Sequence, residues 1–356
     1  MAGRLAVLLP DLDYGGTQAN LITFANALAA RSHQVDLITF GPGTALASRI
    51  SPAIERLNFD GPGGGLAPLI GYLRRVRPRA VLSALTRINL MAVCARIASG
   101  TRPRLVLSIR STLSRDIAEN PKRRAFLPLI RRAYPVADAI FAVSEGAADD
   151  FSALSRIPRA RIGVIYNPVV SDRIARGAAE PLDDPWAAGA GLVVGCGRLS
   201  REKDFPTLIR AVARLEDPVR LVILGEGPAR AGLQAEIDRL WLADRVRLPG
   251  ATPNPYAWMA RAWAFALSST GEGLPTVLIE AMACGAPVVA TDCPHGPREI
   301  LDGGRLAPLV PVGDPDALAK ALAAALARPR PVRYPLERFE ESRAVDVLEA
   351  LLLGDV

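Results

Sequence analysis

Short apolar runs and segments with helical periodicity alternate along nearly the whole chain. Apolar runs typical of strands buried on both faces occur at residues 5–9, 35–40, 54–59, 80–85, 105–109, 139–143 and 162–165. Between them, apolar positions recur at helical spacing in residues 18–30, 66–77, 88–99, 121–134 and 145–154. This alternation over residues 1–170 predicts an α/β domain with a parallel sheet and helices on its faces.

A second alternating series begins at residue 191. It predicts strands at 192–196, 221–224, 246–248, 265–268 and 287–291, and helices that start at residues 204, 228, 255, 275 and 316. Residues 171–190 are rich in Ala, Asp, Gly and Pro and lack periodicity, which favours a linker. We therefore predict two Rossmann-like, doubly wound domains, residues 1–170 and 191–335, that face each other across a cleft at their strand ends. A last helix within residues 336–356 is expected to pack back on the first domain.

Composition limits the compartment and the class of protein. The chain has 356 residues, half of them apolar, which is enough for two cores of ordinary size. Its four cysteines form no Cys-x-x-Cys pair and do not cluster with the two histidines, which argues for a reducing compartment and against structural zinc. No run reaches the about 18 to 20 apolar residues of a membrane span, and residues 5–10 are too short for a signal peptide. We expect a cytoplasmic protein whose membrane contact, if any, is peripheral.

Charge is unevenly distributed along the chain. Residues 1–170 contain 22 Arg and Lys against 11 Asp and Glu, whereas the remainder contains 21 against 25. Residues 122–132 are apolar on one side and basic on the other, a pattern typical of a helix on the anionic inner face of a cytoplasmic membrane. A solvated helix in an Arg-rich chain fits the pattern equally well. Nucleic acid is disfavoured as a partner because neither a recognised motif nor interleaved aromatic residues are present.

Residues 268–285 read as a strand end, a tight glycine-containing turn and a helix that ends near Gly285. Glu272 lies in the turn and Glu280 two helical turns further on, so one carboxylate stands at the helix entrance and the other partway along it. Between them, the free backbone N–H groups within residues 274–277 form a positive pole suited to phosphate. An ordinary βα unit with a dipole-complementing Glu and a solvent-facing Glu explains the local pattern equally well.

The strand that opens the second series ends in a glycine-rich, cationic segment. Gly195 and Gly197 permit close backbone approach, and Arg198 and Lys203 place two cations just before a helix that starts at residue 204. Two cations beside a helix N-terminus suit a diphosphate. The chain otherwise uses Arg and has only three lysines, so a lysine at this position favours a binding role for Arg198 and Lys203 over a solvent-exposed pair.

Three motifs give the chain a specific family resemblance. They are Gly-Arg-Leu-x-x-x-Lys-Asp at residues 197–204, the segment 272–285 with its Glu-x7-Glu spacing, and Pro-Val-Val-Ala-Thr-Asp at the start of residues 287–301. Together with the Gly15-Gly16 turn after the first strand, they resemble the family 4 (group 1) retaining glycosyltransferases of the GT-B fold. The resemblance covers nearly the whole chain, although a lone glycine pair is compatible with a plain turn.

The resemblance implies roles for individual residues. Arg198 and Lys203 would bind the donor's diphosphate and stabilise its developing charge, Glu280 would hold the ribose hydroxyls, and Glu272 would contact a hydroxyl of the transferred sugar. Further donor contacts are implied for a set of small residues and backbone amides, of which the glycine pair lies in the opposite domain: Gly15, Gly16, Gly197, Gly250, Ala251, Gly273, Leu274, Pro275, Thr276 and Val277.

The resemblance also implies a reaction. It is the transfer, with retention, of a hexose or N-acetylhexosamine from a nucleotide-diphosphate sugar, UDP favoured over GDP, to a hydroxyl of a glycan or lipid-linked acceptor. Such a reaction serves cell-envelope polysaccharide or glycolipid synthesis. No metal and no other cofactor is expected, because Arg and Lys take the metal's part. Retention is attributed to front-face attack, in which the leaving phosphate oxygen accepts the acceptor's proton.

One departure from the family pattern concerns the acceptor side. Many relatives carry a His at the end of the strand equivalent to residues 105–109, where this chain has Arg110. The histidines here are His33, expected to be structural, and His295, in a loop expected to face the cleft. Arg110 and His295 are therefore the candidates for contacts near the acceptor.

Three alternatives to a transferase remain open from the sequence. A phosphorylase on the same fold requires a Schiff-base lysine, and Lys203 is better explained by the diphosphate. A nucleotide-sugar epimerase requires acid–base residues at the sugar carbon, for which the two histidines are poorly placed. A non-catalytic nucleotide-sugar-binding protein is disfavoured by the complete set of donor residues.

Overall fold

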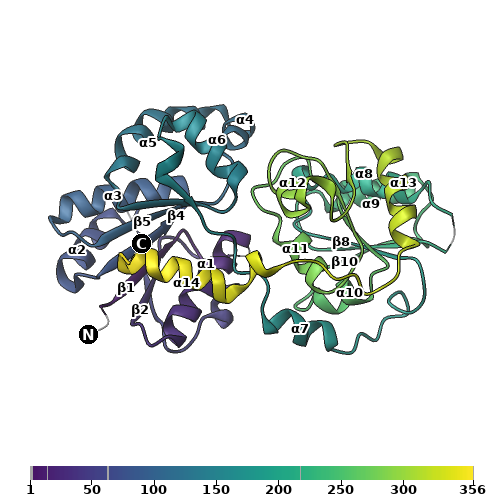
Figure 1. The fold of residues 1–356 in the computed structure, drawn as a ribbon, viewed down its shortest axis with the longest axis horizontal. Helices are drawn as coiled ribbons and strands as arrows, with labels where there is room; N and C mark the ends of the chain where they lie inside the picture. Colours follow the sequence, from purple (N-terminus) through teal and green to yellow (C-terminus); the bar gives the residue numbers. More distant parts are fainter. Residues whose placement is uncertain (1–2, 14, 62–63, 217, 356) are drawn as a thin grey trace. The chain divides into compact units, whose positions relative to one another are not determined.

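The structure, a computed structural model, describes residues 3–13, 15–61, 64–216 and 218–355. The chain divides into two compact units. Unit 1 comprises residues 1–168 and 339–356, and unit 2 comprises residues 169–338. Each unit is an α/β layer structure built around one parallel sheet (Figure 1), so the α/β class with two parallel-sheet domains is confirmed.

Unit 1 contains a seven-stranded parallel sheet of order β3-β2-β1-β4-β5-β6-β7. Its interior strand β1 is buried at every position, as expected for a strand covered by helices on both faces. The edge strand β3 instead exposes charged residues, which discourages pairing with another chain. The strands are β1 (Leu5–Leu9), β2 (Val35–Thr39), β3 (Glu55–Asn58), β4 (Ala80–Ala84), β5 (Arg104–Ile109), β6 (Ala139–Ala142) and β7 (Ile162–Val164).

Helices of unit 1 lie between successive parallel strands, except for the last one, which follows unit 2 in the chain. They are α1 (Gly16–Ala30), α2 (Leu66–Val76), α3 (Thr86–Ser99), α4 (Leu113–Glu119), α5 (Leu127–Ala133), α6 (Glu145–Ser155) and α14 (Glu341–Leu353). The segment predicted as one helix over 121–134 is divided. Residues Pro121–Phe126 form a 3₁₀ helix, η2, and α5 follows it. Pro128 at the second position of α5 has no N–H to donate, which favours the start of a new helix there.

The C-terminal helix α14 completes the core of unit 1. Its apolar stripe of Ala344, Val345, Leu348 and Leu352 joins the same cluster of buried side chains as β1 and α1. The yellow α14 lies beside the purple α1 (Figure 1). Polar contacts surround this stripe, and Glu349 is the common partner of Arg31 and His33, with His33 Nε2 at 2.5 Å from Glu349 Oε1.

Unit 2 contains a six-stranded parallel sheet of order β10-β9-β8-β11-β12-β13. The order reverses at β8, and such a reversal is where doubly wound sheets bind ligands beyond the carboxyl ends of their strands. The strands are β8 (Leu192–Cys196), β9 (Arg220–Leu224), β10 (Val246–Gly250), β11 (Ala264–Leu267), β12 (Val288–Thr291) and β13 (Leu309–Val310).

The helices of unit 2 are α7 (Asp172–Ala179), α8 (Phe205–Val212), α9 (Arg230–Arg239), α10 (Tyr256–Arg261), α11 (Thr276–Ala283), α12 (Gly296–Ile300) and α13 (Pro315–Leu326). Residues 171–190, expected to form a linker, contain α7, which packs on α10 within unit 2. Asn254 fixes this contact by donating to the carbonyl of Gly177 at 2.9 Å and to Glu180 at 2.7 Å. The segment lacked a visible periodicity because only Ile174 and Gly177 of this short helix are buried.

Candidate functional site

The loops that follow β8 and β9 are pressed together backbone to backbone. Gly197 N donates to the carbonyl of Leu224, and Leu199 N donates to the carbonyl of Glu226, both at 2.9 Å. Gly225 has φ +142°, and a Cβ added there would lie 1.9 Å from the carbonyl oxygen of Gly197. Only glycine permits this approach. Main-chain contacts with the loop after β9 therefore hold the loop that carries Arg198 and Lys203 in place.

Lys203 and Glu272 form an ion pair in which Lys203 Nζ lies 2.6 Å from Glu272 Oε1. Their side chains are only 17% and 12% exposed. Ser269 Oγ donates to the same carboxylate oxygen at 2.7 Å, and Ser268 Oγ donates to the carbonyl of Lys203 at 2.7 Å. Three helices and three strands, α8 to β11, separate these residues in the chain, yet the end of β8 and the end of β11 bring them into contact.

Glu272 Oε2 and the remaining N–H groups of Lys203 have no hydrogen-bond partner among the residues that the structure describes. Arg198, in the same loop, has an exposed side chain without an ion pair to any described residue. Gly197, with φ +155°, lies against the Lys203 side chain, and its missing Cβ leaves that side chain room. Gly195, by contrast, is explained by packing, because a Cβ there would lie 3.0 Å from Leu208.

Glu280 projects from α11 toward the end of β8. The hydroxyl of Tyr256 donates to Glu280 Oε1 at 3.4 Å. Burial, with a smaller contribution from the Glu280 charge, raises the pKa of the Cys196 thiol to about 12, and the same two causes raise the pKa of Cys284 to about 12. Lys203 acts on Cys196 in the opposite direction. Glu280, Lys203 and Cys196 therefore share one region at the strand ends, in which the thiols remain protonated.

The turn that precedes α11 is supported by the loop that carries His295. A Cβ on Gly296 would lie 2.4 Å from Pro275 Cδ and 3.1 Å from the carbonyl oxygen of Gly273. Leu274 and Pro275 are buried, whereas Thr276 and Val277 in the first turn of α11 are half-buried. His295 itself has φ +72° and ψ −130°, a conformation rarely adopted by a residue with a side chain. The structure thus places His295 beside the Glu272 turn.

Gly250 and Ala251 follow the adjacent strand β10. Gly250 has φ +98°, and a Cβ there would lie 2.8 Å from Glu226 Oε1. Glu226 in turn receives a hydrogen bond from Arg230 at 3.0 Å, and Ala251 is exposed. Glu226 was not identified from the sequence, although its position between Gly225 and Gly227 at a strand end is a recognisable signal. Ser269 and Tyr256, which contact the two glutamates, carried no such signal.

Gly15, Gly16 and Arg110 lie in unit 1. Gly15 precedes α1 with extended backbone and lies against Gln18, whereas a Cβ on Gly16 would meet no described atom within 4 Å. Arg110 follows β5 and donates from Nη2 to Asn167 Oδ1 at 2.6 Å. Its Nε and Nη1 are buried and have no hydrogen-bond partner among the described residues. Burial lowers the pKa of Arg110 to about 10.

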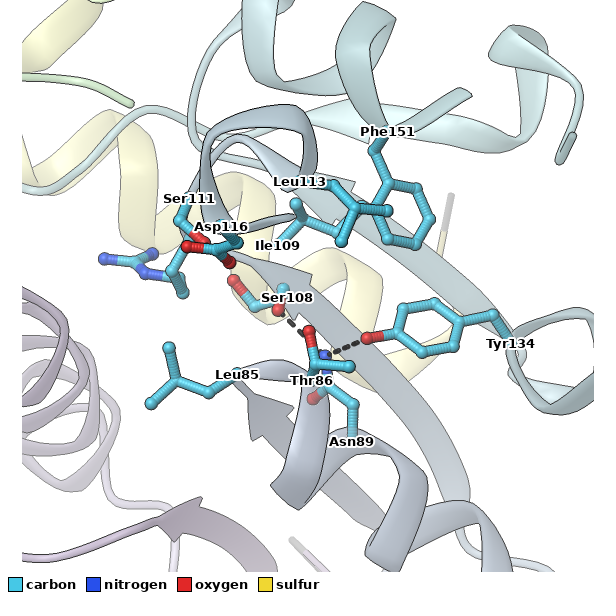
Figure 2. Close-up of a pocket in the computed structure, with 11 residues that line it drawn as sticks. Leu85, Thr86, Asn89, Ser108, Ile109, Ser111, Leu113, Asp116, Tyr134 and Phe151 are labelled. Carbon is cyan, nitrogen blue, oxygen red and sulfur yellow. Dashed lines mark hydrogen bonds between the residues drawn. The ribbon is translucent and has the colours of Figure 1, made fainter. Parts of the chain in front are cut away.

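Arg110 also lines a small pocket in unit 1, at the ends of β4 and β5 (Figure 2). Its lining includes Asn89 from α3 and Ser108 from β5, together with Tyr134 and Phe151. We refer to it as the Asn89 pocket. Its polar residues are far apart in the sequence and match no motif, so sequence reasoning did not find it.

No group of three or more His, Cys, Asp and Glu side chains suited to a metal ion occurs within the described residues. The candidate site in unit 2 is instead built from Arg198, Lys203, Glu272 and Glu280 with the start of α11.

Two family models match the chain in consecutive segments. Residues 14–173 match the model described as Glycosyltransferase Family 4, and residues 190–328 match that described as Glycosyl transferases group 1. The boundary between the two matches falls close to the boundary between units 1 and 2.

Two Campylobacter jejuni proteins are among the curated relatives. One, named N-acetylgalactosamine-N,N'-diacetylbacillosaminyl-diphospho-undecaprenol 4-alpha-N-acetylgalactosaminyltransferase, is 35% identical over 239 residues, which are 67% of this chain and 64% of the relative. The chain thus matches a little under two thirds of the length of that relative. The other, named GalNAc-alpha-(1->4)-GalNAc-alpha-(1->3)-diNAcBac-PP-undecaprenol alpha-1,4-N-acetyl-D-galactosaminyltransferase, is 26% identical over 335 residues, which are 90% of this chain and 88% of the relative.

Among solved structures, Anabaena Alr3699/HepE in complex with UDP and glucose is similar with a TM-score of 0.83. The two chains are 21% identical, and the match covers 99% of this chain and 100% of that one. The lipopolysaccharide outer core galactosyltransferase WaaB is similar with a TM-score of 0.71 at 20% identity, over 99% of this chain and 100% of that one. These likenesses confirm the predicted GT-B fold.

Proposed function

Because the chain belongs to the family 4 (group 1) glycosyltransferases, we propose that it transfers a hexose or N-acetylhexosamine from a nucleotide-diphosphate sugar to a hydroxyl of a lipid-linked or oligosaccharide acceptor. The transfer retains the anomeric configuration. The observation that carries this proposal is the group at the strand ends of unit 2, in which Lys203 pairs with Glu272 beside an exposed Arg198.

The donor's diphosphate binds to Arg198 and to the N–H groups of Lys203 that Glu272 does not use. Both cations stand at the end of β8, where the order of the sheet reverses and ligands of doubly wound sheets bind. Glu272 Oε2, which receives no hydrogen bond from a described residue, accepts one from a hydroxyl of the transferred sugar. Glu280 accepts hydrogen bonds from the ribose hydroxyls, and the start of α11 with residues 273–277 lines the sugar and phosphates.

In the reaction, the bond between the anomeric carbon and the diphosphate oxygen breaks, and the acceptor oxygen bonds to the same face of that carbon. The acceptor's proton passes to the leaving phosphate oxygen. Arg198 and Lys203 stabilise the negative charge that develops on the diphosphate, which is the principal task of the protein in this step. No metal ion is required, because these two cations neutralise the leaving group.

The nucleotide of the donor is UDP rather than GDP, and the product enters cell-envelope polysaccharide or glycolipid synthesis. Support comes from the relatives. HepE was crystallised with UDP, and the two Campylobacter relatives are named for transfer to saccharides on undecaprenol diphosphate. Their named acceptors motivate a lipid-linked saccharide as the acceptor class for this chain.

A donor panel tests this function. Purified protein is incubated with UDP-, GDP- and ADP-sugars and with undecaprenol-diphosphate-linked saccharides, and release of the nucleoside diphosphate is measured. We expect turnover with a UDP-sugar, and a loss of about 10²- to 10³-fold in kcat/KM in Arg198→Ala, because a cation that stabilises the leaving group is removed.

Arg201→Ala is the matched control, since Arg201 is an exposed arginine in the same loop, three residues further on. It should retain turnover within a few-fold. Full turnover in Arg198→Ala would contradict the site, and tight UDP-sugar binding without transfer to any acceptor would favour a non-catalytic binding protein.

We further propose that the segment formed by η2 and α5 places the enzyme on the anionic inner face of the cytoplasmic membrane. Leu127 and Ile130 of this segment are buried, whereas Phe126 and Leu129 are 38% and 54% exposed. Lys122, Arg124 and Arg132 are exposed on the same segment. Apolar side chains next to cations suit a lipid surface better than water. No helix within the described residues is both long and apolar enough to cross a bilayer.

Co-sedimentation with phosphatidylglycerol vesicles tests this surface. We expect the triple variant Lys122→Ala, Arg124→Ala, Arg132→Ala to bind about a hundredfold more weakly at low salt. Arg123 and Arg131 are left in place because they contact Asp116 and the carbonyl of Leu154. The control removes three other exposed arginines of unit 1, Arg49, Arg75 and Arg102. Equal weakening in both variants would indicate attraction by net charge alone and contradict a specific surface.

A further inference from the structure

His295 holds a backbone conformation that residues with a side chain rarely adopt. It lies between β12 and α12 with φ +72° and ψ −130°, which is outside the left-handed helical region where non-glycine residues sometimes occur. Glycine adopts this conformation without the steric cost of a Cβ. At the ends of β8, β9 and β10 the chain does use glycine where φ is positive, at Gly197, Gly225 and Gly250. The loop after β12 therefore carries a strain that these three loops avoid.

Contacts on both sides of His295 hold this strained turn in place. Before it, the buried hydroxyl of Thr291 donates to the carbonyl of Ser269, just after β11, at 2.6 Å. After it, Gly296 packs so closely that a Cβ there would lie 2.4 Å from Pro275 Cδ. These contacts are made by backbone atoms and by side chains other than the imidazole. A glycine at residue 295 would therefore satisfy them with less strain.

The imidazole of His295 is free to bind a ligand. It is half-buried, and it makes no hydrogen bond or ion pair with any residue that the structure describes. Its ring nitrogens are not among the buried side-chain atoms that lack a partner within the described ranges, so they remain accessible. Strained backbone conformations concentrate at binding and catalytic sites, where the surrounding structure imposes them in order to position a group. The strain is therefore explained by a role of the side chain outside the fold.

The strand order places His295 on the side of Glu272 that is remote from the two cations. In the sheet, β8, β11 and β12 are consecutive neighbours, about 4.8 Å apart. The loop after β8 carries Arg198 and Lys203, which bind the diphosphate in the proposed function, and the loop after β11 carries Glu272, which binds a sugar hydroxyl. A group on the next loop along is better placed for the sugar than for the phosphates. An imidazole suits a hydroxyl, because each can donate and accept a hydrogen bond.

We propose that His295 binds a hydroxyl of the transferred sugar, at a position on the ring other than the one that Glu272 contacts. This rests on the proposed function, which supplies the nucleotide-sugar donor. It moves His295 from the acceptor side, where the sequence suggested a contact, to the donor sugar within unit 2. The imidazole then contributes to the choice of sugar, and the chain tolerates the backbone strain in order to present it.

Ligand binding by variants of residue 295 separates the imidazole from the backbone strain. UDP, UDP-glucose and UDP-N-acetylgalactosamine are titrated calorimetrically into the full-length protein. His295→Ala and His295→Gly should each weaken at least one UDP-sugar about three- to tenfold and leave UDP within about twofold, because a single hydrogen bond to the sugar is lost. Of these two, His295→Gly should also raise the midpoint of urea denaturation, because glycine relieves the strain. His295→Asn keeps a donor and an acceptor and should recover part of the affinity.

Trp241→Gly is the matched control. Trp241 also has a positive φ, of +56°, and it is 89% exposed after α9 in the same unit. Glycine should relieve the strain there too, while the affinity for all three ligands stays unchanged. A gain in stability together with weaker sugar binding is therefore expected in His295→Gly and not in Trp241→Gly.

Unchanged affinity for both UDP-sugars in His295→Ala and His295→Gly would overturn the proposal. An equal weakening of UDP would also overturn it, since the imidazole would then contact the nucleotide or support the fold of the site. If the wild-type protein bound neither UDP nor either UDP-sugar, the proposed function would fail as well. Wild-type binding of UDP, with sugar affinities that do not depend on residue 295, would overturn this inference alone.

Discussion

Both units carry a largely buried cation at the ends of their strands, but only the cation of unit 2 has a counter-ion within the described residues. In unit 2, the cation Lys203 is matched by Glu272 at 2.6 Å. In unit 1, the cation Arg110 donates only to the neutral Asn167, and its Nε and Nη1 have no partner among the described residues. Burial alone lowers the pKa of Arg110 to about 10.

This difference indicates how each region would meet a substrate. The unit 2 region is preorganised, because its charges are held by one another and by main-chain contacts between its loops, so a ligand meets a fixed geometry. The unit 1 region leaves hydrogen-bonding capacity unused in Arg110. A ligand there would supply the missing partners, and removing the guanidinium should cost selectivity rather than stability.

The largest effect is expected from breaking the main-chain contact of unit 2. Gly225→Ala places a Cβ 1.9 Å from the carbonyl oxygen of Gly197, at φ +142°. We expect a loss of about 3 kcal/mol or more in the free energy of unfolding, together with loss of nucleotide binding, because the loops after β8 and β9 must separate. Chemical denaturation and UDP titration measure the two effects.

Gly232→Ala provides the control for that substitution. Gly232 lies in α9, and a Cβ there would meet nothing within 4 Å. Alanine is the better helix former, so this variant should be more stable by up to about 1 kcal/mol. A Gly225→Ala protein as stable as wild type would show that the close contact between Gly225 and Gly197 does not stabilise unit 2.

The next effect concerns the ion pair. Lys203→Met removes the counter-ion of the Glu272 carboxylate, which is only 12% exposed. Glu272→Gln removes the counter-ion of the Lys203 ammonium, which is 17% exposed. A double-mutant cycle should yield a coupling of about 1 to 3 kcal/mol in the free energy of unfolding, because neither partner is well solvated alone. Additive single effects would mean that the pair contributes no mutual stabilisation.

Arg110 should behave in the opposite way. In Arg110→Gln the free energy of unfolding should be unchanged or higher by about 1 kcal/mol, because a buried charge without a counter-ion is removed. Acceptor-side kcat/KM should nevertheless fall, while UDP binding stays the same. Denaturation curves and acceptor titrations distinguish the two quantities. If Arg110→Gln lowered the free energy of unfolding as much as Lys203→Met does, the unpaired cation of unit 1 would stabilise the fold as much as the paired cation of unit 2, against our expectation.

The smallest effect is a pH dependence in unit 1. The hydrogen bond with His33, followed by that with Arg31, lowers the pKa of Glu349 below its ordinary 4.5. A carboxyl with a lowered folded pKa stabilises the fold above 4.5, and this contribution is lost as the pH falls through the folded value. Hydrogen exchange of α14 should therefore be faster in Glu349→Gln than in wild type at pH 6.

The difference between these two proteins should shrink as the pH falls below 4.5 and disappear below the lowered folded pKa, where wild-type Glu349 is protonated as well. A constant difference across that range would show that the carboxylate charge is not what holds α14.

The sequence was sufficient for the fold class because parallel strands buried on both faces leave continuous apolar runs, such as β1 and β8. Some short elements were missed for a different reason. The helices α4, α7 and α12 have at most eight residues, and β13 has two, so each presents too few periodic positions to be recognised.

The sequence predicted the residues of the candidate site in unit 2 but not those of the Asn89 pocket in unit 1. In unit 2, Arg198, Lys203, Glu272 and Glu280 lie in compact motifs, because loops at strand ends concentrate chemistry in consecutive residues. The side chains that line the Asn89 pocket come from α3, β5, α4 and α6 and from Tyr134, and only tertiary structure brings them together. The contacts of Ser269 and Tyr256 with the two glutamates were hidden for the same reason.

The return of the chain to unit 1 through α14 has a consequence for synthesis on the ribosome. The side chains of Val345, Leu348 and Leu352 belong to the same core cluster as β1, yet they are translated after the whole of unit 2. Unit 2 is continuous in sequence and can complete its core as it emerges. The residues of unit 1 that precede unit 2 are made earlier, but part of their apolar surface stays uncovered until α14 has been translated. The unit that begins first is therefore the one that finishes last.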